Sequence, residues 1–92
     1  VWRYQPESNE LVRESAENLC PSLGNAPCTL GFAGEGKYGS MHAGSAYQNV
    51  GLYCASEGLG NVVKATGVEV MKKQIKMPAG YDLVIIQSIG KP

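Results

Sequence analysis

Apolar and polar residues alternate most clearly at the two ends of the chain. Val1–Gln5 and Leu11–Arg13 are short strand-like runs joined by the turn residues Pro6–Asn9, which predicts a β-hairpin. Near the other end, Asp82–Ile89 is the strongest strand pattern of the chain. Its four successive apolar residues, 83–86, predict burial on both faces of a sheet.

The middle of the chain carries the longest helical pattern. It predicts a helix from Met41 to Glu57, with Ser40 as the N-cap and Gly58 as the stop. Its apolar positions form a ridge of mostly small residues and a second strip beside it: Ala43, Tyr47, Gly51 and Ala55, then Ala46, Val50, Tyr53 and Cys54. Such a pattern is typical of ordinary core packing. It is also typical of a central or interface helix that delivers the next strand to a ligand.

The remaining segments are shorter. They predict strands at Cys28–Phe32 and Asn61–Ala65, a short helix from Val68 to Lys76, one helical turn at Ser15–Asn18 and a loop over Cys20–Pro27. The order strand, strand, strand, helix, strand, helix, strand predicts an α/β (α+β) layered fold in a single domain, 1–92. Because only one long helix is available, we expect one sheet face to lack a cover and to need a partner surface.

Length and charge narrow the function classes. Ninety-two residues allow one small domain with a modest core. Eight basic and eight acidic residues give no net charge, which argues against a nucleic-acid-binding surface. No apolar run approaches the ~20 residues that span a bilayer. No signal-peptide pattern opens the chain, so a cytoplasmic location is expected, with a processed exported form as the alternative.

The metal-binding and redox residue types are few. The chain has three cysteines, Cys20, Cys28 and Cys54, and one histidine, His42. No Cys-x-x-Cys pair is present, so a zinc site is not expected. Three free thiols in a reducing compartment are favoured, and a Cys20–Cys28 disulfide is the alternative.

The glycine-rich stretch Gly34–Gly39 matches the dinucleotide-binding pattern G-x-G-x-x-G between a strand and a helix. In that pattern the glycines let the backbone approach a pyrophosphate at the helix N-terminus. The acidic residue expected after the second strand is missing, because Val62–Val63 is followed by Lys64. A glycine-rich surface loop is therefore favoured over a dinucleotide site.

Two longer stretches carry a family resemblance. The run from Ala43 to Val63 resembles the nitroreductase family, whose members carry an alanine- and glycine-rich helix with Gln–Asn, then Gly–Leu–Gly, then an apolar strand. The run from Leu83 to Pro92 resembles the late strand of that family and its glycine-containing end. The N-terminal hairpin is similar to one found in a branch of the family. The resemblance covers the C-terminal portion of the family domain.

This resemblance implies an FMN-dependent oxidoreductase. Such proteins use NAD(P)H to reduce the flavin and then pass electrons to nitro compounds, quinones or similar acceptors. They are usually homodimers that hold the flavin between subunits. The resemblance therefore implies that the helix from Met41 to Glu57 lies at or near a dimer core.

The resemblance also implies the cofactor-binding residues. Backbone groups along one short stretch would meet the isoalloxazine ring, one amide pointing at its N5 atom: Val63, Lys64, Ala65 and Thr66. His42 matches a position where a family side chain approaches the flavin, and Lys91 could approach the phosphate. No catalytic side chain is expected, because a backbone amide can tune the flavin without an acid or base.

The sequence departs from the family in one major respect. These 92 residues do not contain the family's N-terminal half, including its Arg-Ser-x-Arg-like motif that grips the phosphate. Three interpretations stay open. The chain is a fragment of a flavin reductase, another chain supplies the rest, or flavin binding is lost and the chain is a dimerising binding or assembly module.

Overall fold

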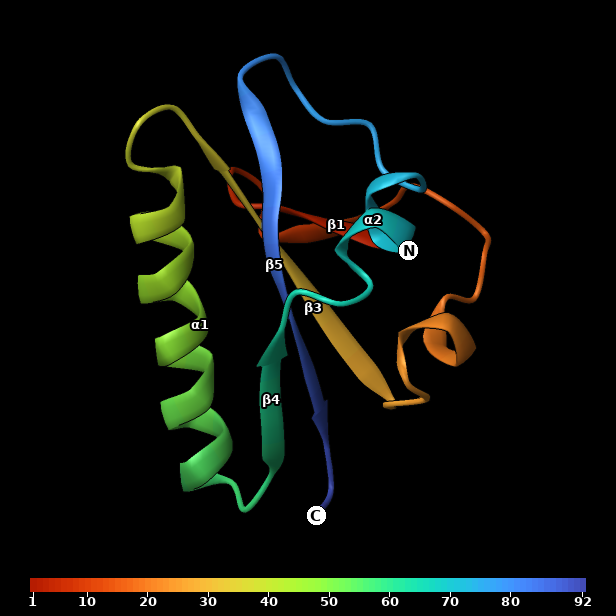
Figure 1. Cartoon of the computed structure of the whole chain (residues 1–92), viewed down its shortest axis with the longest axis vertical. Helices are drawn as coiled ribbons and strands as arrows, with labels where there is room; N and C mark the ends of the chain where they lie inside the picture. Colours follow the sequence, from red (N-terminus) through yellow and green to blue (C-terminus); the bar gives the residue numbers. More distant parts are fainter.

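Two antiparallel sheets and one long helix make up the computed structural model, which describes all 92 residues (Figure 1). In chain order the elements are β1 (Trp2–Gln5), β2 (Glu10–Arg13), the 3-10 turn η1 (Cys20–Leu23), β3 (Cys28–Glu35), α1 (Gly39–Ser56), β4 (Gly60–Lys64), α2 (Val68–Lys72) and β5 (Tyr81–Gly90). Strands β1 and β2 form the predicted hairpin, and the larger sheet has the order β3-β5-β4. The α+β class is therefore confirmed.

Strand β5 occupies the centre of the larger sheet because its side chains are apolar on both faces. Ile86 and Gln87 are adjacent and both fully buried, which confirms the predicted burial on two faces. The β3–β5 register shifts between Phe32 and Ala33, so that Val84 has no partner in β3. This bulge places Leu83 and Ile86 on the same face of the sheet, although they are three residues apart.

The two faces of this sheet carry different covers (Figure 1). Helix α1 packs on one face of the sheet. There the rings of Phe32 and Tyr47 meet edge to face, with their centroids 6.4 Å apart. On the other face the hydrophobic core brings together η1, α2 and β5 through Leu23, Met71, Leu83 and Ile86. Helix α2 is one turn shorter than predicted and ends at Lys72.

The start of α1 corrects the predicted N-cap. The helix begins at Gly39, after Tyr38, and no side chain caps it, so Ser40 lies inside the first turn. The cause is a close approach between β3 and the helix. A Cβ on Gly34 would lie 2.6 Å from the Gly39 carbonyl oxygen.

The same contact explains the Gly34–Gly39 motif without a dinucleotide. Gly34 and Gly39 allow the two backbones to touch, and Gly36 supplies a left-handed turn residue at φ 67°. In addition, β5 lies between β3 and β4, so these two strands do not form the adjacent parallel pair of a dinucleotide-binding unit. The structure thus favours the loop interpretation.

The predicted ridge of α1 is only partly correct. Ala43 is buried and Gly51 is half-buried, but Ala55 is exposed. Cys54, not Ala55, is buried between α1 and the sheet. Residues four apart drift by about 40° around a helix at each step, so a strict spacing of four leaves the buried face. Tyr53, assigned to the second strip, is also exposed.

The segment between the hairpin and β3 also differs from expectation. Ser15–Asn18 forms no helical turn, whereas the predicted loop contains η1. The hairpin is joined to the body by the Ser15 hydroxyl, which donates a hydrogen bond to the Gln74 amide oxygen at 3.0 Å. Trp2 remains 59% exposed and Tyr4 56% exposed, so one face of the hairpin lacks a cover.

The close approach of β3 and α1 predicts a difference between two glycine substitutions. Gly34→Ala should lower the free energy of unfolding by about 1–3 kcal/mol, because backbone atoms must move to admit the Cβ. Gly44→Ala is the matched control, since its Cβ would meet only ordinary contacts at 3.9 Å inside a helix. It should raise stability by up to about 1 kcal/mol. Urea unfolding measures both, and equal midpoints for Gly34→Ala and the wild type would contradict this packing.

Candidate functional site

Strand β4 (Gly60–Lys64) and the turn that follows it contain four of the six predicted cofactor-binding residues, and β4 is an edge strand. It pairs with β5 alone, with Val63 opposite Gln87 and Lys64 opposite Ile86. Its outer edge therefore presents backbone N–H and C=O groups that no other strand binds. Ala65 and Thr66 follow in an exposed turn, where the Ala65 carbonyl accepts a hydrogen bond from the Val68 amide at 3.2 Å. The predicted strand end at Ala65 is thus one residue too late.

The side chain of Lys64 lies on the face of the sheet away from α1 and is held within the chain. Its ammonium group donates a hydrogen bond to the Leu23 carbonyl at 2.7 Å and so ties β4 to the end of η1. Val63 points to the opposite face, toward α1, as does its strand partner Gln87. Any ligand contact of Lys64 would therefore use its backbone, as the family resemblance implies for this stretch.

His42 lies in the first turns of α1, on an exposed side of the helix. Its side chain forms no hydrogen bond or salt bridge within the chain. Helix α1 and β4 run in opposite directions (Figure 1), so the N-terminal turns of α1, which include His42, lie toward the end of β4 that leads to Thr66. The helix is about 27 Å long and the strand about 16 Å, so His42 lies beyond that end.

Lys91 lies at the opposite end of β4. It follows Gly90, which pairs with Gly60 at the first position of the strand. Lys91 lines a shallow hollow of about 270 Å³ together with Asn61 and Ser88. The six predicted residues therefore do not form one cluster. They are spread along β4, with Lys91 at its start, Val63–Thr66 at its end and His42 beyond.

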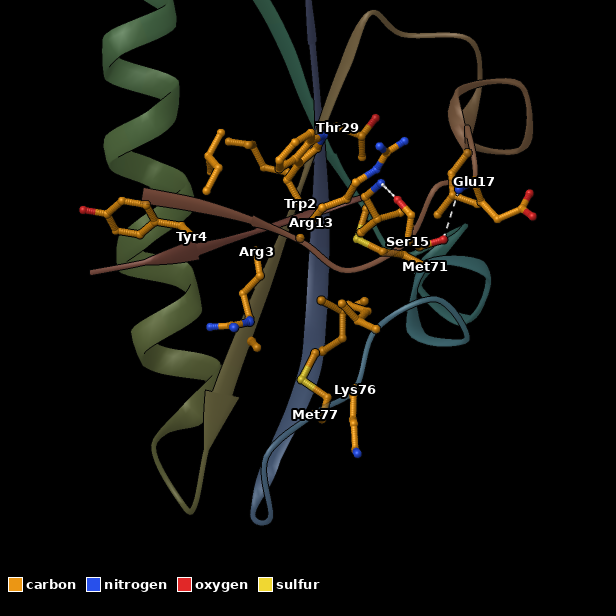
Figure 2. Close-up of a pocket in the computed structure, with 18 of the residues that line it drawn as sticks. Trp2, Arg3, Tyr4, Arg13, Ser15, Glu17, Thr29, Met71, Lys76 and Met77 are labelled. Carbon is orange, nitrogen blue, oxygen red and sulfur yellow. Dashed lines mark hydrogen bonds between the residues drawn. The ribbon is translucent and has the colours of Figure 1, made fainter. Parts of the chain in front are cut away.

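A larger cleft, of about 1060 Å³, lies between the hairpin and the face of the sheet that carries α2. Figure 2 shows Trp2 and Arg13 entering from the hairpin, and Met71 and Met77 from α2 and the segment after it. Arg13 lies over the Trp2 ring at 5.8 Å and forms no salt bridge. None of the six predicted residues lines this cleft.

Sequence reasoning missed this cleft, although one signal pointed toward it. Trp2 and Tyr4 share one face of β1, and two large aromatic side chains on one strand face indicate a surface that must be covered. The cleft is lined mainly by hydrophobic residues, and charged side chains such as Arg13, Glu17 and Lys76 lie among them. It can hold an apolar group or a covering segment of polypeptide, and we find no arrangement for bond chemistry in it.

A group of charge interactions lies at the start of β5, away from β4. Lys72 on α2 binds Asp82 at 2.8 Å and Glu69 at 3.7 Å. The hydrogen bond from Lys72 lowers the pKa of Asp82 below its ordinary value, and the same bond raises the pKa of Lys72. Tyr81 donates a hydrogen bond to Glu35 at 3.2 Å, which raises the pKa of the phenol. These pairs fasten α2 and β3 to β5.

The chain shows no metal centre. No group of three or more His, Cys, Asp and Glu side chains could hold a metal ion. Cys20, Cys28 and Cys54 are all free thiols, so the Cys20–Cys28 disulfide is not formed. No helix is both long enough and apolar enough to cross a membrane.

Comparisons with protein-family models, curated proteins and solved structures found no match to this chain. The geometry along β4 and the residues that resemble a known family are therefore the observations that bear on function.

The Lys72–Asp82 pair predicts a pH dependence of stability. Because folding lowers the pKa of Asp82, the ionised carboxylate stabilises the fold above its ordinary pKa of 3.8, and this contribution is lost as the pH falls through the folded-state pKa. Asp82→Asn should therefore lower the melting temperature at pH 7 and have a smaller effect at pH 3. Glu10→Gln, at an exposed position without a salt bridge, is the control and should change neither value. An Asp82→Asn effect of equal size at both pH values would refute this assignment.

Proposed function

We propose that this chain is the flavin-contacting portion of an FMN-dependent oxidoreductase of the nitroreductase type. In this proposal it reduces nitro, quinone or similar acceptors with NAD(P)H, and a second copy or a partner chain completes the flavin site. The proposal rests on the resemblance of Ala43–Val63 and Leu83–Pro92 to that family. One structural observation carries it further, namely the open backbone edge of β4.

The edge of β4 fits a flat, elongated cofactor. The isoalloxazine ring would lie against the backbone of Val63–Thr66, where the residues near the turn are exposed and the strand has no outer partner. The phosphate would extend toward Lys91, about 13 Å away at the other end of the strand. FMN, when bound, supplies a ring that accepts hydride at N5. The chain's contribution is to orient that ring and to donate a backbone hydrogen bond to it.

The size of the exposed surface supports a partner. The chain exposes 6269 Å², whereas a folded monomer of 9.8 kDa is expected to expose about 5200 Å². The excess, roughly 1100 Å², is comparable to the ~800 Å² that each partner buries in a standard interface. Two surfaces contribute to it: the hairpin cleft, and the outer face of α1, where Met41 is 67% exposed and Leu52 is 61% exposed.

A second function is favoured by one observation. Lys91 is the only cation that we find at the proposed phosphate end, whereas Lys64 is held by the Leu23 carbonyl. A chain with so weak a phosphate site would serve as a flavin-free module that dimerises through α1. The two functions differ in whether the assembled protein takes up FMN.

FMN uptake is the direct test. The purified protein, alone and with any chain that copurifies with it, is mixed with FMN, desalted and examined by visible absorption. We expect a retained flavin spectrum that bleaches when NADH or NADPH is added without oxygen. A colourless protein under all these conditions would reject the oxidoreductase function and leave the flavin-free module.

The phosphate contact has its own test. Lys91→Ala should weaken FMN binding about tenfold, because a charge-assisted hydrogen bond contributes about 1.5–3 kcal/mol. Binding of riboflavin, which lacks the phosphate, should not change. Lys73→Ala, at an exposed position after α2, is the control. Equal losses for FMN and riboflavin would place Lys91 away from the phosphate.

The outer face of α1 can be tested separately. Leu52→Glu should shift the protein from dimer to monomer in sedimentation experiments, because a charge would be buried in an apolar contact. Ala79→Glu adds the same charge at an exposed turn position outside α1 and tests whether charge alone matters. A Leu52→Glu protein that stays dimeric would exclude this face as the interface.

A further inference from the structure

Gln87 is an unusual residue for the centre of a small core. It is 0% exposed, and it is the only fully buried polar side chain in the chain. It lies in the middle of β5, between α1 and the sheet, next to Ile86. A buried amide opposes folding unless its hydrogen-bonding groups are all satisfied.

The amide of Gln87 joins three elements. Its nitrogen donates to the Asn61 side-chain oxygen on β4 at 2.9 Å and to the Tyr47 carbonyl on α1 at 3.3 Å. In the ladder it sits directly opposite Val63, the first residue of the proposed flavin-facing stretch. The Gln87 side chain thus sets the distance between β4 and α1 beside Val63.

The side-chain oxygen of Gln87 indicates that a contribution to stability alone does not explain a glutamine at this position. The Gln87 side-chain oxygen is buried and has no hydrogen-bond partner. A leucine or methionine at this position would fill similar space without an unsatisfied acceptor. An apolar side chain could not, however, replace the two hydrogen bonds that the Gln87 nitrogen donates.

A second contact holds β4 from the opposite face. The Lys64 ammonium group donates to the Leu23 carbonyl at 2.7 Å, on the side of the sheet away from α1. An edge strand with one backbone partner opens more easily than a central strand. Here side chains on both faces, Gln87 through Asn61 and Lys64 through Leu23, restrain the strand while its outer edge stays free.

We infer that Gln87 is a positioning residue that holds the backbone of β4 in place for a ligand on its outer edge. Its link to FMN rests on the function proposed above. Its effect on β4 does not, because the hydrogen bonds to Asn61 and Tyr47 exist within the chain itself. Preorganised backbone donors bind and orient a ligand more effectively than mobile ones.

Amide hydrogen exchange tests this role without FMN. Gln87→Leu should speed the exchange of the Val63 or Lys64 amide, whichever donates to β5, by about tenfold or more, and leave the Phe32 amide on β3 unchanged. Ser88→Ala, at the adjacent buried position on the other face of β5, is the matched control and should leave β4 protection intact. Uniform acceleration across β3 and β4 would overturn the inference, because it would indicate a general loss of stability.

Asn61→Ala provides a second route if Gln87→Leu fails to fold. Asn61 is exposed, so its truncation removes the same hydrogen bond with little disturbance of the core. It should reproduce the faster exchange of the Val63 or Lys64 amide that donates to β5. Unchanged exchange at both residues in Asn61→Ala would contradict the inference as directly as a negative result with Gln87→Leu.

FMN adds a separate readout. If the assembled wild type binds FMN, Gln87→Leu should shift the visible spectrum or the reduction potential of the bound flavin, whereas Thr29→Ala, on β3, should not. A flavin with unchanged spectrum and potential would show that β4 is not held for the ring. If the wild type binds no FMN, the proposed function fails, and the exchange experiment still decides whether Gln87 positions β4.

Discussion

The burial of β5 between two different covers is the constraint on which the rest of the structure depends. Its side chains meet α1 on one face and the Leu23–Met71 core on the other, so β3 and β4 become edge strands. A central strand buried on both faces stabilises a small sheet more than either edge can. The consequence is that β4 keeps an open backbone edge while its side chains are anchored from both faces.

That arrangement matches the chemistry proposed for this chain. A protein that uses a flavin must orient the ring, protect it from competing reactions and donate a hydrogen bond near N5. Backbone groups can supply the orientation and the hydrogen bond. Under the proposed function these six predicted residues need not cluster, because a long ligand would contact a line of groups along β4. The uncovered hairpin face and the outer face of α1 indicate where additional polypeptide would pack.

Much of the fold could be predicted from the sequence, for physical reasons that are specific to each element. The alternation in Val1–Gln5 and the apolar run in β5 were sufficient to place those strands. The start of α1 could not be predicted, because it depends on the contact of Gly34 with Gly39 across a turn. The role of Gln87 was also invisible, because its partners Asn61 and Tyr47 are distant in sequence.

The proposed function requires FMN to lie along the outer edge of β4. Amide chemical shifts of the assembled protein, recorded during an FMN titration, can detect this contact. We expect the largest changes at Val63–Thr66, with a further change at Lys91. Changes confined to the hairpin cleft around Trp2 and Met71, or no saturable change at any amide, would contradict it.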